Sequence, residues 1–588
     1  MNNMKKIAIL MAFAALTLGA TSCNDYLDKV PLDKNSDVTN WTSEASLESF
    51  AWSMYGNFLG YGNGGSRGDF LNTGMSDNVL TDGFSQPTQN LPATSSGWNN
   101  RYTEIRKTNI LLNRIELVPN LSEEAANHWR GVARFFRGMK HYQLVATYGD
   151  VIWVDSEINI DDSEALSRSR DPRLTVMKNV CEDLQFAADN CRNTTNNTVN
   201  SDVANALLAR VALFEAAWQK YHENNNGEAK ALYEIAKKAS SAIISSGRYS
   251  IHDKYLSNYI SKDLNGNKEM ILYKVYCATA EGAKVQKTHG TQGWSCSSSK
   301  SNSLTKSGVE SFVMSNGLPI HMGNYDDSSI EKIVTDRDAR LSLIIDPEVI
   351  CPVGWSWKEG INSTTGYNTD KFVDWNDYGT TTWLSPANTS DSPIYGYAEV
   401  LMNYAEACAE IEDLGGANMT QADLDKSVNV TRAKHGNLPA LTYAGKGKVS
   451  VNGTAITKDP KNDTGISELL WEVRRERRNE LMCDGFRYED LRRWKLGRYL
   501  DYAKNIECIL GASLKAIDAY VAATKGLDQY DGAKYSEIID GNFWIDGYMT
   551  SINTAKNVRV FDENKNYLEP IPSNEITLNP NLTQNPGW

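Results

Sequence analysis

Few residues in this sequence are spaced as catalysis would require. Residues 64–68 read Gly-Gly-Ser-Arg-Gly and satisfy the G-x-S-x-G pattern of serine hydrolases. That pattern needs a strand before the serine and a helix after it, so that the turn holds the hydroxyl in place. Residues 60–63 are Gly-Tyr-Gly-Asn, which favours a loop. Ser66 is therefore predicted to lie in a glycine-rich turn, and because no pair of acids or nucleophile–base pair can be identified, the protein is predicted not to be an enzyme.

The residues that bind metals are also poorly placed. The seven histidines never come within the spacing of a zinc motif. Residues 263–269 alternate Asp, Asn, Asn and Glu as calcium loops do, but Gly266 stands where an EF-hand has no glycine. An Asn-Gly turn before a strand at about 270–276 explains the segment more simply. We expect no metal and no cofactor, and structural calcium is the less favoured alternative.

Aromatic side chains in polar segments are the residues best suited to ligand binding here. Residues 279–393 are rich in Gly, Ser, Thr and Asn, show little helical periodicity, and contain five of the 15 tryptophans. Indole rings pack against the C–H faces of sugars, while Asn, Asp and Arg pair with the hydroxyls. One such aromatic contact contributes about 1–3 kcal/mol, so several are needed for useful affinity.

The elements that must position these loops are amphipathic helices. Leu207, Val211, Phe214 and Trp218 repeat at the three-to-four spacing of one helix face, which predicts a helix over 201–220. A second such pattern closes at Gly247, and the short turn between the two predicts an antiparallel pair similar to a tetratricopeptide unit. Further helices are expected at 105–118, 123–148, 397–411 and 466–481. The predicted fold is mainly α: a helical scaffold over about 40–278 and 394–588, with a loop-rich insertion over about 279–393.

The first 22 residues are predicted to be a signal peptide. Lys5 and Lys6 precede an apolar run over 7–20, which is shorter than the ~20 residues of a membrane-spanning helix. Residues 18–23 then read Leu-Gly-Ala-Thr-Ser-Cys and resemble the lipobox of bacterial lipoproteins, in which Cys23 becomes the acylated first residue. A secreted protein without lipid is the alternative. No later segment has a second long apolar run, so residues after Cys23 are expected on one side of the membrane.

Charge and cysteine content exclude further classes. The chain has 60 basic and 73 acidic residues. Because acidic residues are in excess, the sequence lacks the basic character of a nucleic-acid-binding protein. The arginines at 474–478 alternate with glutamates at i, i+4 spacing, which indicates ion pairs on a helix. No C-x-x-C pair occurs among the cysteines after Cys23. Cys408 and Cys483 lie in apolar patterns and are expected to be buried thiols, while a bridge between Cys181 and Cys191 stays open.

Four segments, in order along the whole chain, resemble the SusD/RagB family of outer-membrane nutrient-binding lipoproteins. The chain departs mildly from the family at Cys483-Asp484-Gly485, where Phe-Glu-Gly is usual, and at Trp588, where Tyr is usual. The segments are Cys23-Asn-Asp-Tyr-Leu-Asp28; Ala133-Arg-Phe-Phe-Arg-Gly138 with Tyr148-Gly-Asp-Val151; 397–407 with 476–481 and 484–487; and Pro570-Ile-Pro572 with Gln584-Asn-Pro-Gly-Trp588.

The resemblance implies a function in nutrient capture. It implies a lipid anchor at Cys23 on the outer face of the outer membrane, and a SusC-like TonB-dependent transporter as partner. The protein would capture oligosaccharides and deliver them to that transporter. Oligopeptide capture in the same import system is the alternative within the family, and a surface hydrolase or a pure assembly scaffold are alternatives from other classes.

The family also suggests where ligand contacts lie. Its starch-binding members carry aromatic residues in a loop before an early helix and in mid-chain loops. By location, the candidates in this sequence are Trp98, Asn100 and Arg101, just before the helix expected at 105–118, and Trp294, Trp355, Trp357 and Trp375.

Overall fold

The structure is a computed structural model of the whole chain. It describes residues 40–81, 85–193, 197–279, 287–295, 302–345, 365–377, 380, 386–513, 515–516, 536–539, 542–546 and 559–588. Within these ranges, no helix combines the length and apolar character needed to cross a bilayer.

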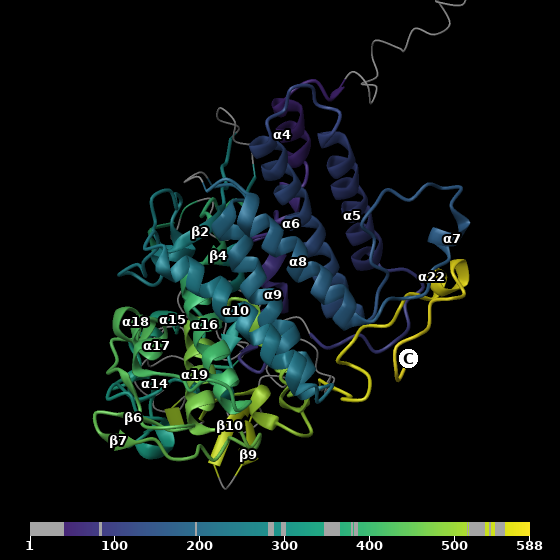
Figure 1. Cartoon of the computed structure of the whole chain (residues 1–588). Coiled ribbons are helices and arrows are strands. Elements are labelled where there is room, and N and C mark those ends of the chain that lie inside the picture. The colour runs from purple at the N-terminus through teal and green to yellow at the C-terminus, as the bar shows by residue number, and fades with distance from the viewer. Residues whose placement is uncertain are drawn as a thin grey trace, which may run out of the picture.

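Long helices dominate the part of the chain that the structure describes (Figure 1). The prediction of a mainly α-helical fold is confirmed. The helices are α4 (Glu44–Trp52), α5 (Ser96–Ile115), α6 (Glu123–Tyr148), α7 (Ser163–Leu166), α8 (Arg173–Asn190), α9 (Ser201–Tyr221), α10 (Asn226–Ser245), α11 (Ser257–Ile260), α12 (Thr291–Ser295), α13 (Lys306–Glu310), α14 (Ile330–Val334), α15 (Ala339–Ile344), α16 (Tyr397–Asp413), α17 (Gln421–Asp425), α18 (Val428–Lys434), α19 (Glu468–Glu480), α20 (Phe486–Arg493) and α22 (Ser573–Leu578).

Short strands and 3₁₀ turns connect these helices. The strands form antiparallel sheets with the orders β1-β3, β2-β4, β5-β6-β7 and β8-β10-β9. The 3₁₀ turns are η1 (Tyr55–Asn57), η2 (Gly68–Met75), η3 (Ile320–Met322), η4 (Trp375–Asp377), η5 (Gly497–Leu500) and η6 (Ile506–Cys508). The strands are β1 (Val79–Leu80), β2 (Met270–Lys274), β3 (Ser303–Leu304), β4 (Ser392–Gly396), β5 (Leu441–Tyr443), β6 (Val449–Val451), β7 (Thr454–Ala455), β8 (Leu510–Ser513), β9 (Ser536–Ile539) and β10 (Asn542–Asp546).

The helices that follow one another along the chain also pack against one another. α5 packs on α6, α6 on α8, α8 on α9, and α9 on α10, after which α16 packs on α10 and α19 on α16. Figure 1 shows the first of these helices side by side in the upper half. Capping explains where they begin: the Asn200 side chain accepts the N–H of Val203 at the start of α9, and Ser122 accepts that of Ala125 at the start of α6. The alanines of α9 are buried at 0–1% exposure, so neighbouring helices approach closely.

The loop-rich mid-chain segment begins and ends at one small sheet. Strand β2 pairs antiparallel with β4, with Met270 opposite Gly396 and Lys274 opposite Ser392. The described residues between them form short helices, 3₁₀ turns, the two-residue strand β3 and single bridges around a separate apolar cluster that includes Tyr61, Phe70 and Phe372. The pairing brings the two ends of this segment together, and the boundaries of a distinct insertion stay a prediction.

Buried charges tie this segment to the helical scaffold. Arg340 of α15 is fully buried and bonds Asp338 beside it and Glu476 and Glu480 of α19. Lys371 is also fully buried; its ammonium lies 2.6 Å from Asp484 and donates to the carbonyl of Met482. The glutamates of α19 therefore form ion pairs with Arg340, which is distant in sequence, as well as with arginines of their own helix.

The turn before α20 requires glycine. Gly485 has φ of +86°, and a Cβ atom there would lie 2.8 Å from the carbonyl oxygen of Asp69. This explains the Asp484-Gly485 pair physically.

The thiols of Cys408 and Cys483 are free and buried as predicted, and Cys181 and Cys191 are both free, so no bridge joins them.

Candidate functional site

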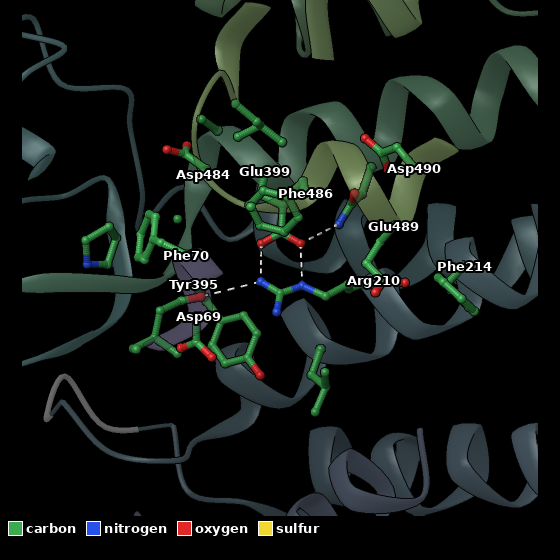
Figure 2. A pocket seen from close by; sticks show the side chains of 18 of the residues that line it. Asp69, Phe70, Arg210, Phe214, Tyr395, Glu399, Asp484, Phe486, Glu489 and Asp490 are labelled. Carbon is green, nitrogen blue, oxygen red and sulfur yellow. Dashed lines mark hydrogen bonds and ion pairs between the residues drawn. The ribbon is translucent and has the colours of Figure 1, made fainter. Parts of the chain in front are cut away.

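A central cavity of 240 Å³ lies among α6, α9, α16, α20 and the β2–β4 pair. Figure 2 shows the ion pair at its centre, where Arg210 of α9 meets Glu399 of α16. Arg210 Nε and Nη2 each lie 2.6 Å from an oxygen of Glu399. The guanidinium also stacks 4.6 Å from the centre of the Tyr395 ring and 5.1 Å from that of Phe486. The ion pair joins α9 to α16, and the stacking orients the rings of Tyr395 and Phe486.

Most of the other carboxyl groups in the cavity are paired as well. Their partners are Arg477 and Arg493 for Asp490, Lys371 for Asp484, Arg492 for Glu489 and His435 for Glu269. Asp69 differs, because the contact found for it within the described ranges is the backbone N–H of Gly60, 2.7 Å from Oδ2. Asp69 is exposed and lines the cavity. Ion pairs of this kind hold neighbouring helices together.

One buried cluster has the composition of a metal site. Ligand atoms of Glu269, His435 and Glu480 lie within 4.8 Å of one another. Both ring nitrogens of His435 are already engaged: Nδ1 lies 2.7 Å from Glu480 Oε1, and Nε2 lies 2.9 Å from the carbonyl oxygen of His252. Burial lowers the pKa of His435, but the adjoining carboxylates of Glu480 and Glu269 raise it to about 8. The cluster is thus explained as a charged hydrogen-bond network.

Trp98, Asn100 and Arg101 lie within a helix and not just before one, as the sequence had suggested. Residues 98–102 lie in the first turns of α5, which begins at Ser96, and not in a loop before the helix. Trp98 is 4% exposed, and its ring packs edge-on against Tyr148 at 5.1 Å. Arg101 donates to Thr147 Oγ1, while Asn100 is exposed. Because the ring of Trp98 packs against α6, it offers no free face to a sugar.

The structure brings two of the mid-chain candidates onto neighbouring segments. Gln292 of α12 donates to Asp377 of η4 at 3.1 Å, which places the segments of Trp294 and Trp375 together. Trp294 is 6% exposed and lies in the apolar cluster under Arg67, whose guanidinium is 5.7 Å from the ring centre. Trp375 is half-buried, with its Nε1 donating to Asp370. Trp294 is therefore a core residue in this conformation, and Trp375 keeps part of its surface accessible.

Three remaining sites cannot be placed. Trp355, Trp357 and the lipidation site Cys23 lie outside the described residues.

Sequence reasoning missed one exposed aromatic residue. Trp52 is 48% exposed and, among the tryptophans whose burial the structure describes, is the one whose side chain is exposed. It lines a 170 Å³ groove with Tyr55, Trp129 and Arg192, between α4 and α6. Helical spacing carried the signal: Leu47 and Ala51 face inward on α4, so the next residue points outward.

The G-x-S-x-G segment is a turn, as predicted. Gly64 and Gly68 have φ of +57° and +52°, and Ser66 is exposed. The segment leads into η2 and has only a single bridge, from Gly64 to His289, where the hydrolase motif needs a strand.

Comparison with known proteins explains this architecture. The model of the SusD family matches residues 356–588, and a model described as starch-binding associating with outer membrane matches residues 25–213. The chain belongs to the SusD/RagB family. A SusD-like protein of Bacteroides ovatus is 23% identical over 442 residues, which cover 71% of this chain and 74% of the relative.

Solved structures of SusD-like proteins share the fold. A SusD-like carbohydrate-binding protein of Bacteroides fragilis superposes with a TM-score of 0.67 at 20% identity, covering 93% of this chain and all of that chain. A laminarin-binding SusD-like protein superposes with a TM-score of 0.52 at 16% identity, with the same coverage. At these identities the likeness establishes the fold.

Proposed function

We propose that this protein is a non-catalytic glycan-binding lipoprotein of the cell surface. It captures oligosaccharides and delivers them to a SusC-like TonB-dependent transporter. The observation that carries the proposal is family membership, with family models matching both ends of the chain and a fold shared with a carbohydrate-binding SusD-like protein over 93% of its length. An acylated Cys23 would hold it on the outer face of the outer membrane.

Sugar recognition is proposed for aromatic rings that keep an accessible face. Trp375 and Trp52 are two such residues. Asn100 and Arg101 offer polar groups on α5, and Trp355 and Trp357 remain candidates from sequence. The aromatic–sugar contact is worth about 1–3 kcal/mol per ring, so removing one ring should weaken affinity about five- to hundredfold.

The absence of catalysis is part of the proposal, and the ion pairs support it. The carboxyl groups of the central cavity are mostly held by arginine, lysine or histidine, with Arg210–Glu399 at 2.6 Å as the clearest case. A glycosidase needs two carboxyl groups free to act on one bond. Asp69 alone would not supply that pair.

Titration calorimetry of the mature chain without residues 1–23, against plant, host and microbial glycans and a peptide digest, tests the proposal. We expect one glycan class to bind without product formation and Trp375→Ala to weaken it at least fivefold. Trp588→Ala is the matched control, because Trp588 is half-buried on the C-terminal segment and its Nε1 bonds the carbonyl of Leu568. Binding of peptides alone would replace sugar by oligopeptide, and hydrolysis of the glycan would refute the non-catalytic assignment.

A further inference from the structure

A second cavity, of 500 Å³, is lined largely by charged side chains. It lies between α13, the residues 459–463, α19, α20 and the turns η5 and η6, and it shares no lining residue with the central cavity. Six basic and five acidic residues line it. A cavity of this size and polarity needs either water or a polar ligand to satisfy its walls.

At one end of this cavity two arginines share a single carboxylate. Arg487 Nε and Nη2 lie 2.8 and 3.0 Å from the two oxygens of Asp77, and Arg478 Nη2 lies 3.2 Å from one of them. Asp77 is 1% exposed. The two guanidinium groups therefore share one carboxylate. Burial and the neighbouring charge of Arg487 accordingly lower the pKa of Arg478 to about 9.

The acids elsewhere on the wall are held by other basic residues. Glu310 and Glu507 are each held by both Lys306 and Lys461. Asp459 is paired with Arg475, which also holds Glu472, and Asp463 is paired with Arg498. Among the described residues, Asp77 is therefore the one acid that contacts Arg478 and Arg487.

The same cavity has a buried hydrogen-bond donor without an acceptor. Trp471 Nε1 is buried and has no partner in the described part of the chain. The Nη1 groups of Arg478 and Arg487 are not used in the bonds to Asp77, Asn78 and Ser307, which involve Nε and Nη2, and they are open to the cavity. A buried N–H without an acceptor is rare in native structures. One buried N–H beside two guanidinium groups that share a single carboxylate suits a group that carries several acceptor oxygens and a negative charge.

We propose that this cavity binds the carboxylate or sulfate group of an acidic ligand. The anion accepts hydrogen bonds from Nη1 of Arg478, Nη1 of Arg487 and Nε1 of Trp471. Planar guanidinium groups are suited to both oxyanions, and the indole N–H adds a neutral donor. That the anion belongs to an acidic sugar rests on the proposed function; the anion site itself does not.

Calorimetric titration of the mature chain with sodium sulfate and with sodium glucuronate tests the site. Sodium chloride at equal ionic strength and neutral glucose are the reference ligands. We expect saturable binding at one site for sulfate or glucuronate, and none for glucose or chloride. Binding to sulfate alone identifies a sulfate group, and binding to glucuronate alone identifies a sugar carboxylate.

Two variants connect the binding to the proposed donors. Trp471→Phe keeps the ring and removes the N–H, and Arg487→Lys keeps the charge and removes Nη1. We expect each to weaken anion binding at least about fivefold. Arg192→Gln is the control, since Arg192 pairs with Glu44 and Glu124 on another part of the surface. Trp471→Phe leaves the Asp77 ion pairs intact, so it remains informative if Arg487→Lys fails to fold.

The proposal is overturned by three results. These are no saturable binding of either anion, equal binding by wild type and Trp471→Phe, or equal weakening in Arg192→Gln. Titration with the neutral glycans of the capture experiment distinguishes failure of the anion site from failure of glycan capture. Binding of a neutral glycan without anion binding would refute this site alone, and anion binding without any glycan binding would refute glycan capture alone.

Discussion

The buried guanidinium of Arg340 allows the attachment of the mid-chain segment to the scaffold to be tested. Arg340 makes six N–H···O contacts of 2.6–3.2 Å with Asp338, Glu476 and Glu480. Arg340→Met fills a similar volume and removes the charge. All three carboxylates would then lose their shared cation inside the protein.

The expected loss of unfolding free energy depends on which partners each carboxylate keeps in Arg340→Met. Glu480 keeps the bond to His435, and Glu476 keeps Thr431 and a contact to Arg432. Asp338 is fully buried and, within the described residues, loses its only cation. Breaking a buried ion pair so that one charge is left unpaired costs about 3–5 kcal/mol. We therefore expect Arg340→Met to lower the free energy of unfolding by about 3–5 kcal/mol.

Urea unfolding followed by tryptophan fluorescence and far-UV circular dichroism measures this loss. Arg130→Met is the matched control, because Arg130 and its partner Glu116 are 30% and 65% exposed and a surface pair contributes about 0–1 kcal/mol. Adding Asp338→Asn to Arg340→Met should recover part of the stability, because the unpaired charge is gone. A loss below about 1 kcal/mol, or no recovery in the double variant, would refute the reasoning.

Two further predictions concern single residues. Gly485→Ala should lower the free energy of unfolding by at least about 2 kcal/mol, measured by urea unfolding. Gly453→Ala is the control: Gly453 has φ of +80° but open space around a Cβ atom, so its loss should be only about 1 kcal/mol. Equal losses in the two variants would show that the contact with Asp69 is unimportant. Burial raises the pKa of Glu269 from 4.5 to about 7, so the folded protein holds a proton that the unfolded chain releases, and the free energy of unfolding should fall as pH rises from about 4.5 to 7. Glu269→Gln should remove roughly 3 kcal/mol of that fall, and an unchanged pH profile would contradict it.

Much of the scaffold could be predicted because helical periodicity is a local property. The helix expected at 123–148 has those bounds in the structure, and the one expected at 201–220 extends by a single residue. Apolar residues at three-to-four spacing, with a polar cap before them, specify a helix face without knowledge of its partner. The turn at residues 64–68 and the buried thiols of Cys408 and Cys483 were predictable for the same local reason.

The order of motifs along the chain also determined the family. What the motifs do physically was not visible in them. Glu476 and Glu480 were expected to pair with arginines of their own helix, but both bond Arg340, which is more than 130 residues away in sequence. A local pattern shows that an acid needs a cation, and only the folded chain shows which cation is near.

The side chains that could bind a ligand were decided by the tertiary structure. Trp294 lies in a polar segment, yet Tyr61, Phe70 and Phe372 surround its ring at 5.7–6.2 Å. Trp98 is covered by Tyr148, and Trp52, which has no unusual sequence context, is exposed. The arginine-lined cavity brings Asp77 of the N-terminal part to Arg478 and Arg487 in the same way. Composition fixes how much aromatic and charged surface exists, whereas burial depends on neighbours that arrive from distant parts of the chain.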